Sequence, residues 1–233
     1  MSGERELPPG QRPLVVAHRG ASARAHENTL EAFRLAVALG ADGVELDVHA
    51  TRDHRLLVHH DPDLPGRGPI AGLDAAPARS VRLPNGESPP LLDEALAVLA
   101  DLAVFVEVKA MPPEAEDALL ATIAKAPARC AVHSFDHALV ARLSGRGVRL
   151  GLLVERAPAD PGALLAGAGA GDLWPRHDVV TAALVRATHA AGGRVIAWTA
   201  NRADDIRRLA ALGVDGLCTD VPDLARAALE EAA

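Results

Sequence analysis

The 233-residue sequence predicts an α/β protein, a (β/α)8 or TIM barrel, with a small hairpin and a loop excursion after the second strand. Short apolar runs typical of buried strands alternate with segments of helical periodicity over most of the chain. Roughly eight such pairs can be counted, which is the number of units in this barrel. Residues 13–233 are expected to form this one domain, preceded by a flexible tail over residues 1–12.

The start of the domain predicts a strand, a helix and a second strand. The apolar run at residues 14–17 stops at a polar triplet and predicts the first buried strand. A helical pattern from residue 30 follows Asn28 and Thr29, either of which can cap it, and Gly40 closes it. The second strand, around residues 44–48, begins directly afterwards.

The second strand leads into a hairpin and an excursion. A polar turn at residues 51–54 and a short apolar run at residues 55–59 predict the return arm of a β-hairpin. Residues 63–90 are rich in Pro and Gly and show no sustained periodicity. We therefore expect them to form an excursion over the barrel mouth.

From residue 91 onward, helices and strands alternate regularly. We disfavour the alternative fold, a doubly wound open sheet, because no glycine-rich fingerprint follows the first strand and no break into two halves is visible. The predicted strands begin near residues 103, 129, 148, 173, 194 and 216, and the predicted helices cover residues 91–101, 114–125, 136–144, 162–168, 179–191, 203–212 and the chain from 222.

The charge and the hydropathy of the sequence exclude some classes of binding partner. The formal net charge of −7 argues against a nucleic acid or an anionic membrane surface as the main partner. The N-terminal residues lack the apolar segment of a signal peptide, and no apolar run has the length of a membrane span. We therefore expect a cytoplasmic protein without stable membrane insertion that acts on a small molecule. The oligomeric state is not predicted.

Acidic residues spaced by two mark the second and third strands. Glu45 and Asp47 share one face of the second strand, because successive strand residues point to opposite faces, and Glu107 and Lys109 share a face of the third. Neighbouring buried carboxylates repel unless a positive charge lies between them. All-oxygen ligation selects Mg²⁺ or Ca²⁺ over zinc. The pattern indicates a cation site, although the Glu45 and Asp47 pair alone also suits a solvated edge strand.

Basic residues and histidines end neighbouring strands. Arg19 offers a planar guanidinium to phosphate oxygens, and Lys109 offers a point charge. His18 and one of the pair His59 and His60 supply a proton acceptor and a proton donor near neutral pH. A phosphomonoesterase more often uses a nucleophilic Asp or Ser or two metals, and a sugar hydrolase has little use for these cations. The set therefore favours hydrolysis of a phosphodiester.

Each of these residues taken alone also has a structural explanation. His18 suits a structural hydrogen bond at a strand end, and Glu107 suits a plain ion pair with Lys109. Only their arrival at one end of a barrel favours the functional interpretation.

Motifs spread over nearly the whole chain resemble the glycerophosphodiester phosphodiesterase family, and they follow the order found in that family. Any one of them is a weak signal, whereas the set is highly specific. The matching segments are HRG at 18–20, ENTL at 27–30, ELD at 45–47, HDP at 60–62, EVK at 107–109, SF at 134–135, WTAN at 198–201 and GVDGLCTDVP at 213–222.

The resemblance implies a TIM barrel that uses one divalent cation, Mg²⁺ or Ca²⁺, to hydrolyse glycerophosphodiesters to an alcohol and sn-glycerol 3-phosphate. Either the glycerol 2-hydroxyl or water is the attacking group. By position, the resemblance implies Glu45, Asp47 and Glu107 as metal ligands, His18 and His60 as general acid and base, Arg19 and Lys109 as phosphate contacts, and Trp198 as an apolar wall for the substrate.

Two departures from the family pattern concern the mouth. His26 stands where a proline usually precedes ENT, and residues 64–68 lack the usual run after HDP. The sequence therefore does not predict which alcohols the enzyme releases from its substrates. A lysophospholipase D acting on acylated diesters and a barrel that binds phosphodiesters without hydrolysing them are the alternative functions.

Overall fold

Eight parallel strands close into a barrel in the computed structural model, which describes residues 12–126 and 128–231. Each strand pairs with its neighbour in chain order, and β1 pairs with both β2 and β11, which closes the ring. The strands are β1 (Leu14–His18), β2 (Gly43–Ala50), β6 (Ala103–Ala110), β7 (Arg129–Ser134), β8 (Arg149–Val154), β9 (Asp172–Pro175), β10 (Arg194–Ala197) and β11 (Gly216–Thr219). The predicted barrel is confirmed.

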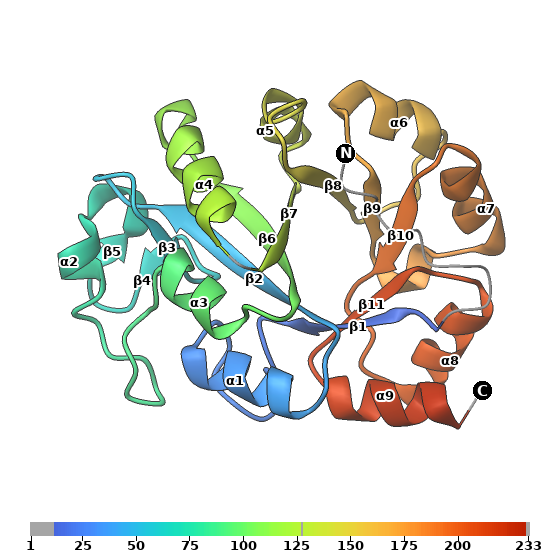
Figure 1. Cartoon of the computed structure of the whole chain (residues 1–233), viewed down its shortest axis with the longest axis horizontal. Helices are drawn as coiled ribbons and strands as arrows, with labels where there is room; N and C mark the ends of the chain where they lie inside the picture. The colour runs from blue at the N-terminus through green and yellow to red at the C-terminus, as the bar shows by residue number, and fades with distance from the viewer. Residues whose placement is uncertain (1–11, 127, 232–233) are drawn as a thin grey trace.

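Helices surround the barrel, as Figure 1 shows. Thr29 caps α1 by accepting a hydrogen bond from the backbone of Ala32, which is one of the two caps expected from the sequence. The short helix η2 (His177–Val179) follows β9. The main helices are α1 (Leu30–Ala38), α3 (Leu92–Val98), α4 (Pro113–Lys125), α5 (His137–Arg142), α6 (Pro161–Ala168), α7 (Ala182–Ala190), α8 (Ala203–Ala211) and α9 (Pro222–Glu230).

The segment after β2 forms the predicted hairpin, with β3 (Leu56–Val58) antiparallel to β2. The excursion over residues 63–90 contains short elements that lie beside the barrel, outside α3 (Figure 1). None of its residues lines either mouth pocket described below, and its placement over the mouth stays a prediction. Its apolar side chains are instead buried with Leu57 and Leu91. Its elements are β4 (Asp63–Leu64), β5 (Gly68–Pro69), η1 (Ile70–Gly72) and α2 (Ala75–Ala78).

Large side chains fill the barrel interior, and a small residue on a neighbouring strand leaves the space that they occupy. Phe105 on β6 and Trp174 on β9 meet edge to face, with ring centroids 5.1 Å apart. Gly151 on β8 lies against the indole of Trp174, since a Cβ there would come within 2.9 Å of the ring. A side chain at position 151 would therefore displace Trp174 from the interior.

A buried ion cluster ties three strands together at the amino-terminal end of the barrel. The Asp172 carboxylate, at the start of β9, is 1% exposed and accepts hydrogen bonds from Arg149 at 2.7 Å and Arg194 at 2.8 Å. Burial alone would raise the pKa of Asp172, but the hydrogen bonds from the two guanidinium groups hold it below its usual value. These arginines begin β8 and β10, so the cluster joins neighbouring strands.

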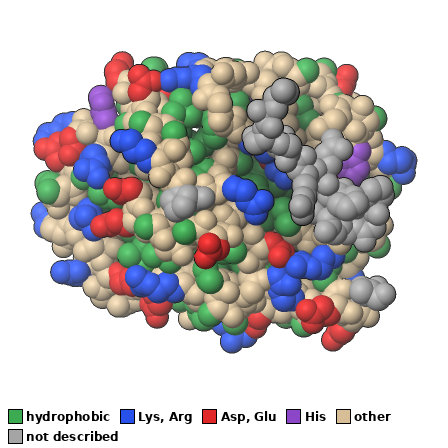
Figure 2. All heavy atoms as spheres, in the orientation of Figure 1, with side chains coloured by type: hydrophobic (Ala, Val, Ile, Leu, Met, Phe, Trp, Pro, Cys, Tyr) green, Lys and Arg blue, Asp and Glu red, His purple; other side chains and the backbone are tan. Residues whose placement is uncertain are grey.

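The outer surface mixes charges of both signs, and Figure 2 shows acidic and basic side chains interspersed on one face. Arg12 pairs with Asp42 at 2.8 Å, while the rest of the predicted N-terminal tail lies outside the described residues. Among the helices that the structure describes, none combines the length and apolar character required to cross a bilayer.

Candidate active site

A pocket of about 270 Å³ opens at the carboxyl ends of the strands, where the sequence places most of its candidate residues. The remainder of its lining is formed by His133, Phe135, Leu153, Glu155, Trp174, Thr199 and Cys218. Seven of the eight predicted site residues line it, and the exception is Asp47, which is fully buried beside it. The seven are His18, Arg19, Glu45, His60, Glu107, Lys109 and Trp198.

A sharp turn after β1 directs His18 and Arg19 into the mouth. Arg19 and Gly20 both adopt left-handed backbone conformations, with φ of 57° and 86°. Only glycine fits at position 20, because a Cβ there would lie 2.7 Å from the backbone of Ala32 in α1. The Arg19 amide donates to the carbonyl of Glu45 at 2.8 Å, so the turn is joined to β2.

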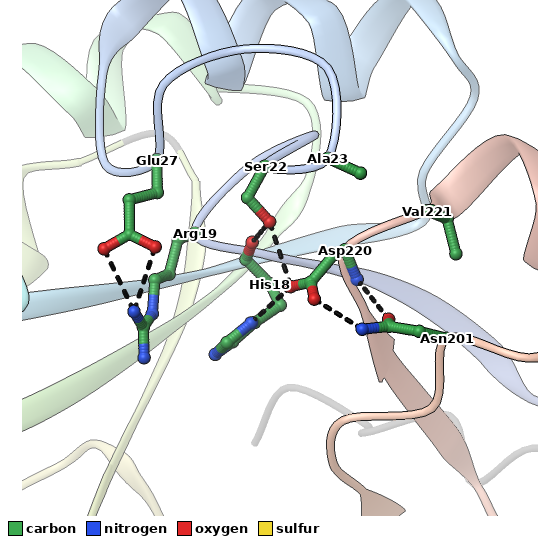
Figure 3. Close-up of a pocket in the computed structure, with 8 residues that line it drawn as sticks. All are labelled: His18, Arg19, Ser22, Ala23, Glu27, Asn201, Asp220 and Val221. Atoms are coloured by element: carbon green, nitrogen blue, oxygen red, sulfur yellow. Dashed lines mark hydrogen bonds and ion pairs between the residues drawn. The ribbon is translucent and has the colours of Figure 1, made fainter. Parts of the chain in front are cut away.

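His18 is oriented by a carboxylate from the last strand. Its Nδ1 lies 2.6 Å from Oδ1 of Asp220, which also lies 3.0 Å from the Ser22 hydroxyl and whose carboxylate is bonded by Asn201 (Figure 3). This leaves Nε2, which is 4.0 Å from Oε2 of Glu45, on the side of the carboxylates. Burial alone would lower the pKa of His18, but the bond with Asp220 and the charge of Glu45 outweigh burial and raise it.

The residues that hold Asp220 and His18 also line a second pocket. This pocket measures about 340 Å³ and shares His18 and Arg19 with the first. Figure 3 shows Asp220 against the His18 ring, with Ser22 and Asn201 bonded to Asp220. His18 therefore borders two adjoining cavities.

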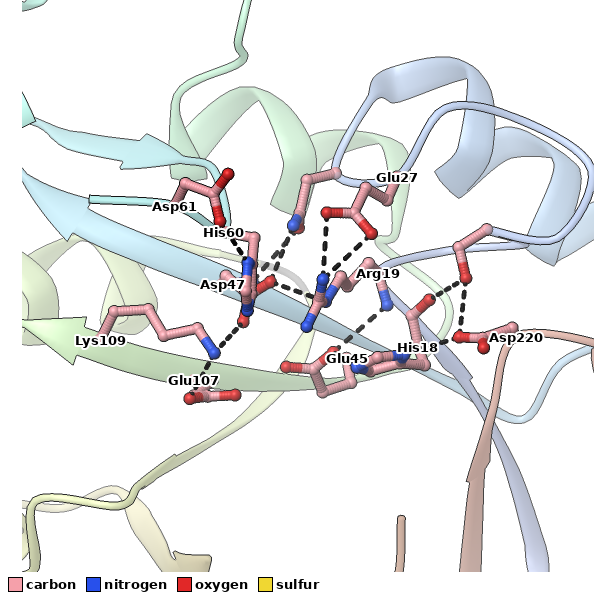
Figure 4. A network of polar contacts seen from close by, with 12 residues as sticks. His18, Arg19, Glu27, Glu45, Asp47, His60, Asp61, Glu107, Lys109 and Asp220 are labelled. Atoms are coloured by element: carbon pink, nitrogen blue, oxygen red, sulfur yellow. Dashed lines mark hydrogen bonds and ion pairs between the residues drawn. The ribbon is translucent and has the colours of Figure 1, made fainter. Parts of the chain in front are cut away.

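The two basic residues of the site are both held by Asp47 (Figure 4). Arg19 Nε lies 3.1 Å from Oδ2 of Asp47, and Lys109 Nζ lies 3.0 Å from Oδ1. Asn28 donates to Oδ2 at 2.8 Å, and Glu27 holds the other end of Arg19 at 3.0 Å. Burial alone would raise the pKa of Asp47, but Lys109, Arg19 and Asn28 lower it.

Lys109 is charged despite its burial. Burial alone would lower the pKa of its ammonium group, but Asp47 and Glu107 raise it, and Glu107 Oε1 lies 2.6 Å from Nζ. Lys109 therefore presents a positive charge in the pocket, between two carboxylates.

Glu45, Glu107 and His133 offer ligand atoms that all lie within 4.8 Å of one another, and all three residues are buried. Burial raises the pKa of Glu107, and the charges of Glu45 and Asp47 raise it further. Glu45 Oε1 is buried with no hydrogen-bond partner among the described residues. An oxygen-rich site with this excess of negative charge fits a divalent cation.

His60 and the aromatic wall complete the pocket. His60 Nδ1 lies 2.8 Å from Oδ1 of Asp61, and the His60 carbonyl is bonded at 3.0 Å by the buried ring of His49. Phe135, with 46% of its surface exposed, meets Trp198 edge to face at 5.5 Å. The Trp198 indole is held by donating to the carbonyl of Trp174 at 2.8 Å. Trp198 thus lines the pocket as a fixed apolar surface.

Sequence reasoning did not assign roles to several residues of this site. His133 and Asp220 were visible as polar residues that end apolar runs, but the pattern does not reveal that they approach Glu45 and His18. His49 lies on β2 two residues after Asp47, so it continues the spacing of two, and this spacing is the signal that could have found it. The signal for Asp220 was the Thr219-Asp220 pair at a predicted strand end.

Comparisons with known proteins relate almost the whole chain to one family. Residues 18–224 match the model of the glycerophosphoryl diester phosphodiesterase family. A glycerophosphodiester phosphodiesterase from Caldanaerobacter subterraneus subsp. tengcongensis is 32% identical over 231 residues, which cover 90% of this chain and 95% of that relative.

Solved structures agree with this relationship. A glycerophosphodiester phosphodiesterase from Agrobacterium tumefaciens superposes with a TM-score of 0.81 at 26% identity, covering 92% of this chain and 99% of that one. A phosphodiesterase from Oleispira antarctica, in complex with the product sn-glycerol-3-phosphate, has a TM-score of 0.86 at 24% identity and covers 94% of this chain and 97% of its own. At this identity, the similarity to the Oleispira antarctica enzyme supports the fold alone.

Proposed function

Because this chain belongs to the glycerophosphoryl diester phosphodiesterase family, we propose that it hydrolyses glycerophosphodiesters to an alcohol and sn-glycerol 3-phosphate, using a divalent cation and two histidines. The observation that carries this proposal is the composition of the mouth pocket. His18, Arg19, Glu45, Glu107 and Lys109 line one cavity together with His60. That cavity supplies binding groups for an anionic diester and two groups for proton transfer.

The residues fit a divalent cation, because two buried carboxylates face the pocket side by side. Glu45 and Glu107 would hold it, and Oε1 of Glu45, which is buried and has no hydrogen-bond partner in the described part of the chain, is available as a ligand atom. Asp47, the third carboxylate expected from the sequence, would join them; it also contacts Lys109 and Arg19, and Glu107 likewise contacts Lys109. Mg²⁺ and Ca²⁺ are the ions that carboxylate oxygens favour. When bound, such an ion polarises phosphoryl oxygens and offsets charge that develops during the reaction.

The chain's own groups supply binding and proton transfer. Arg19 and Lys109 would bind the phosphate, and Trp198 would contact the apolar part of the substrate. One of His18 and His60 would remove the proton of the attacking group, either water or the glycerol 2-hydroxyl, and the other would protonate the departing alcohol. If the hydroxyl attacks, water would then open the cyclic phosphate to give sn-glycerol 3-phosphate. Asp220 keeps the proton of His18 on Nδ1 in the neutral ring, which leaves Nε2 free to accept one.

Release of sn-glycerol 3-phosphate from a panel of glycerophosphodiesters tests the function. With Mg²⁺ or Ca²⁺ present we expect hydrolysis of at least one member, and a rate at least ~10-fold lower after chelation, because the ion stabilises the transition state. An equal rate with and without chelator would remove the metal from the mechanism.

The same panel separates the alternatives. A faster rate on an acylated diester than on its deacylated counterpart would favour a lysophospholipase D, for which the exposed ring of Phe135 beside Trp198 is the relevant surface. Binding of every diester without hydrolysis of any would favour the binding-only barrel.

Replacing Asp220 by Asn is expected to lower kcat by ~10–100-fold while KM changes little. The substitution removes the charge that orients His18 and stabilises its protonated form, but leaves the phosphate contacts intact. The effect should not add to that of His18→Gln, since the two residues act as one unit. Steady-state kinetics of both single variants and the double variant measure this. A double variant with the product of the two losses would contradict the coupling.

A further inference from the structure

His49 is a buried histidine beside the site, and the proposed mechanism does not use it. It lies on β2 two residues after Asp47 and is 5% exposed. Its Nε2 lies 3.0 Å from the backbone carbonyl of His60, one of the two histidines proposed to transfer protons. A carbonyl oxygen can only accept a hydrogen bond, so Nε2 of His49 carries the proton of this bond. This nitrogen is therefore committed to His60 and is not free to exchange protons with a substrate.

The side chain of His60 is oriented by an exposed neighbour. Nδ1 lies 2.8 Å from Oδ1 of Asp61, as Figure 4 shows, and the Asp61 side chain is 71% exposed. Exposed pairs of this kind contribute little stability. Asp61 also follows His60 in the chain, so their bond moves with His60 and does not fix its place relative to the barrel. His18 differs, because its partner Asp220 directly follows β11 at the other end of the chain.

The backbone of His60 lies beyond the strand ladder. β3 ends at Val58, where its pairing with β2 stops. Beyond that point, the amide of His59 donates to the carbonyl of Asp47 at 3.1 Å, and the His49 ring donates to the carbonyl of His60. Both bonds attach this segment to β2, the strand that carries two carboxylates of the site. The position of His60 relative to those carboxylates therefore depends on the His49 ring.

We propose that His49 is a positioning residue, which holds the backbone of His60 so that the His60 ring stays within reach of the substrate. The proposal rests on the proposed function, because it concerns the placement of one of its two histidines. Proton transfer requires hydrogen-bond reach to the reacting atom, so a loosened group loses rate even when its chemistry is intact. The proposed phosphate contacts, Arg19 and Lys109, follow β1 and lie on β6, so the loss is expected in kcat rather than in KM.

Steady-state kinetics of two substitutions, measured on the best diester of the panel, test the proposal. His49→Leu fills similar space without a donor, and it should lower kcat at least ~10-fold with KM changed less than ~2-fold. His49→Gln places an amide N–H near the position of Nε2, and it should restore kcat to within ~3-fold of the wild type. Equal losses in the two variants, or wild-type kcat in His49→Leu, would overturn the proposal.

A double variant shows whether His49 acts through His60. In the His60→Gln background, His49→Leu should cause no further loss of kcat, because the group that it positions is already absent. A second loss of similar size in that background would overturn the proposal. His137→Leu is the matched control, because His137 Nε2 also lies 2.9 Å from a backbone carbonyl, that of Leu153, and this variant should keep wild-type kcat.

Hydrogen exchange of the His59 amide gives a readout that needs no catalysis, because this amide is protected while the segment stays on β2. His49→Leu should raise its exchange rate at least ~10-fold, and His49→Gln should not. If diesters are hydrolysed but His49→Leu keeps wild-type kcat, only this proposal fails. If the wild type hydrolyses no diester, the proposed function fails. Faster exchange in His49→Leu then still supports the placement of His60 by His49, and unchanged exchange overturns it.

Discussion

Replacing His18 by Gln is expected to lower kcat by about 10²–10⁴-fold, the usual scale for loss of a general acid or base. Gln occupies similar space and can still bond Asp220, but its amide cannot accept and return a proton. Of the two histidines in the proposed mechanism, His18 is the one whose Nδ1 lies 2.6 Å from Asp220, with Nε2 toward the carboxylates. Substrate binding by Arg19 and Lys109 should survive, so KM should change little.

Initial rates on the best diester of the panel, together with the affinity for a non-hydrolysed analogue, check this expectation. His54→Gln, at an exposed turn after β2, is the matched control and should keep wild-type kcat. His60→Gln should lower kcat on the same scale if both histidines transfer protons. Wild-type kcat in His18→Gln would remove this residue from the proton-transfer steps.

Asp172→Asn is expected to lower the free energy of unfolding by about 3 kcal/mol, or the melting temperature by about 6–12 °C. The change removes the charge that Arg149 and Arg194 share at the amino-terminal end of the barrel. Breaking a buried ion pair typically costs about 3–5 kcal/mol, and the lower end applies because these arginine side chains are 25% and 28% exposed. Urea unfolding followed by circular dichroism measures the loss.

Asp178→Asn is the matched control, because Arg176 also pairs with Asp178 at 2.7 Å but on the surface, with side chains 45% and 51% exposed. Its loss should stay below about 1 kcal/mol. Equal losses in the two variants would show that burial of the Asp172 cluster is irrelevant to stability.

The contribution of Asp172 should also depend on pH. Its pKa in the folded protein lies below the unfolded value of about 3.9, so the contribution is complete above that value and disappears as the pH falls through the folded pKa. The difference between the wild type and Asp172→Asn should therefore shrink below about pH 4. A difference that stays constant down to pH 3 would contradict this origin.

Much of the barrel was predictable because its strands are short apolar runs separated by capped helices, and such patterns follow from local periodicity. The placement of the excursion was not predictable in the same way. Leu64 and Ile70 are too few and too irregularly spaced to indicate which surface buries them, and that surface, around Leu57 and Leu91, exists only in the folded protein.

The sequence allowed us to predict which strands end in residues of the site. The spacing of two correctly predicted that Glu107 and Lys109 share a face, and Lys109 Nζ lies 2.6 Å from Glu107 Oε1. It did not reveal that Asp47 is engaged by Arg19 and Lys109, or that His133 faces Glu45. These relations depend on the register between neighbouring strands and on side-chain rotamers, which no pattern within a single strand encodes.

The bond between His18 and Asp220 joins residues that are 202 positions apart, because closure of the barrel brings β1 against β11. During synthesis at about 5–20 residues per second, the first member of this pair waits on the order of ten to forty seconds for the second. A nascent chain that has already exposed Glu45, Glu107, Arg19 and Lys109 therefore lacks the contact that orients His18 until β11 and Asp220 have left the ribosome. Under the proposed mechanism, we expect catalytic activity only in chains that have completed the last strand, so turnover measured during translation would report barrel closure rather than the appearance of the first strands.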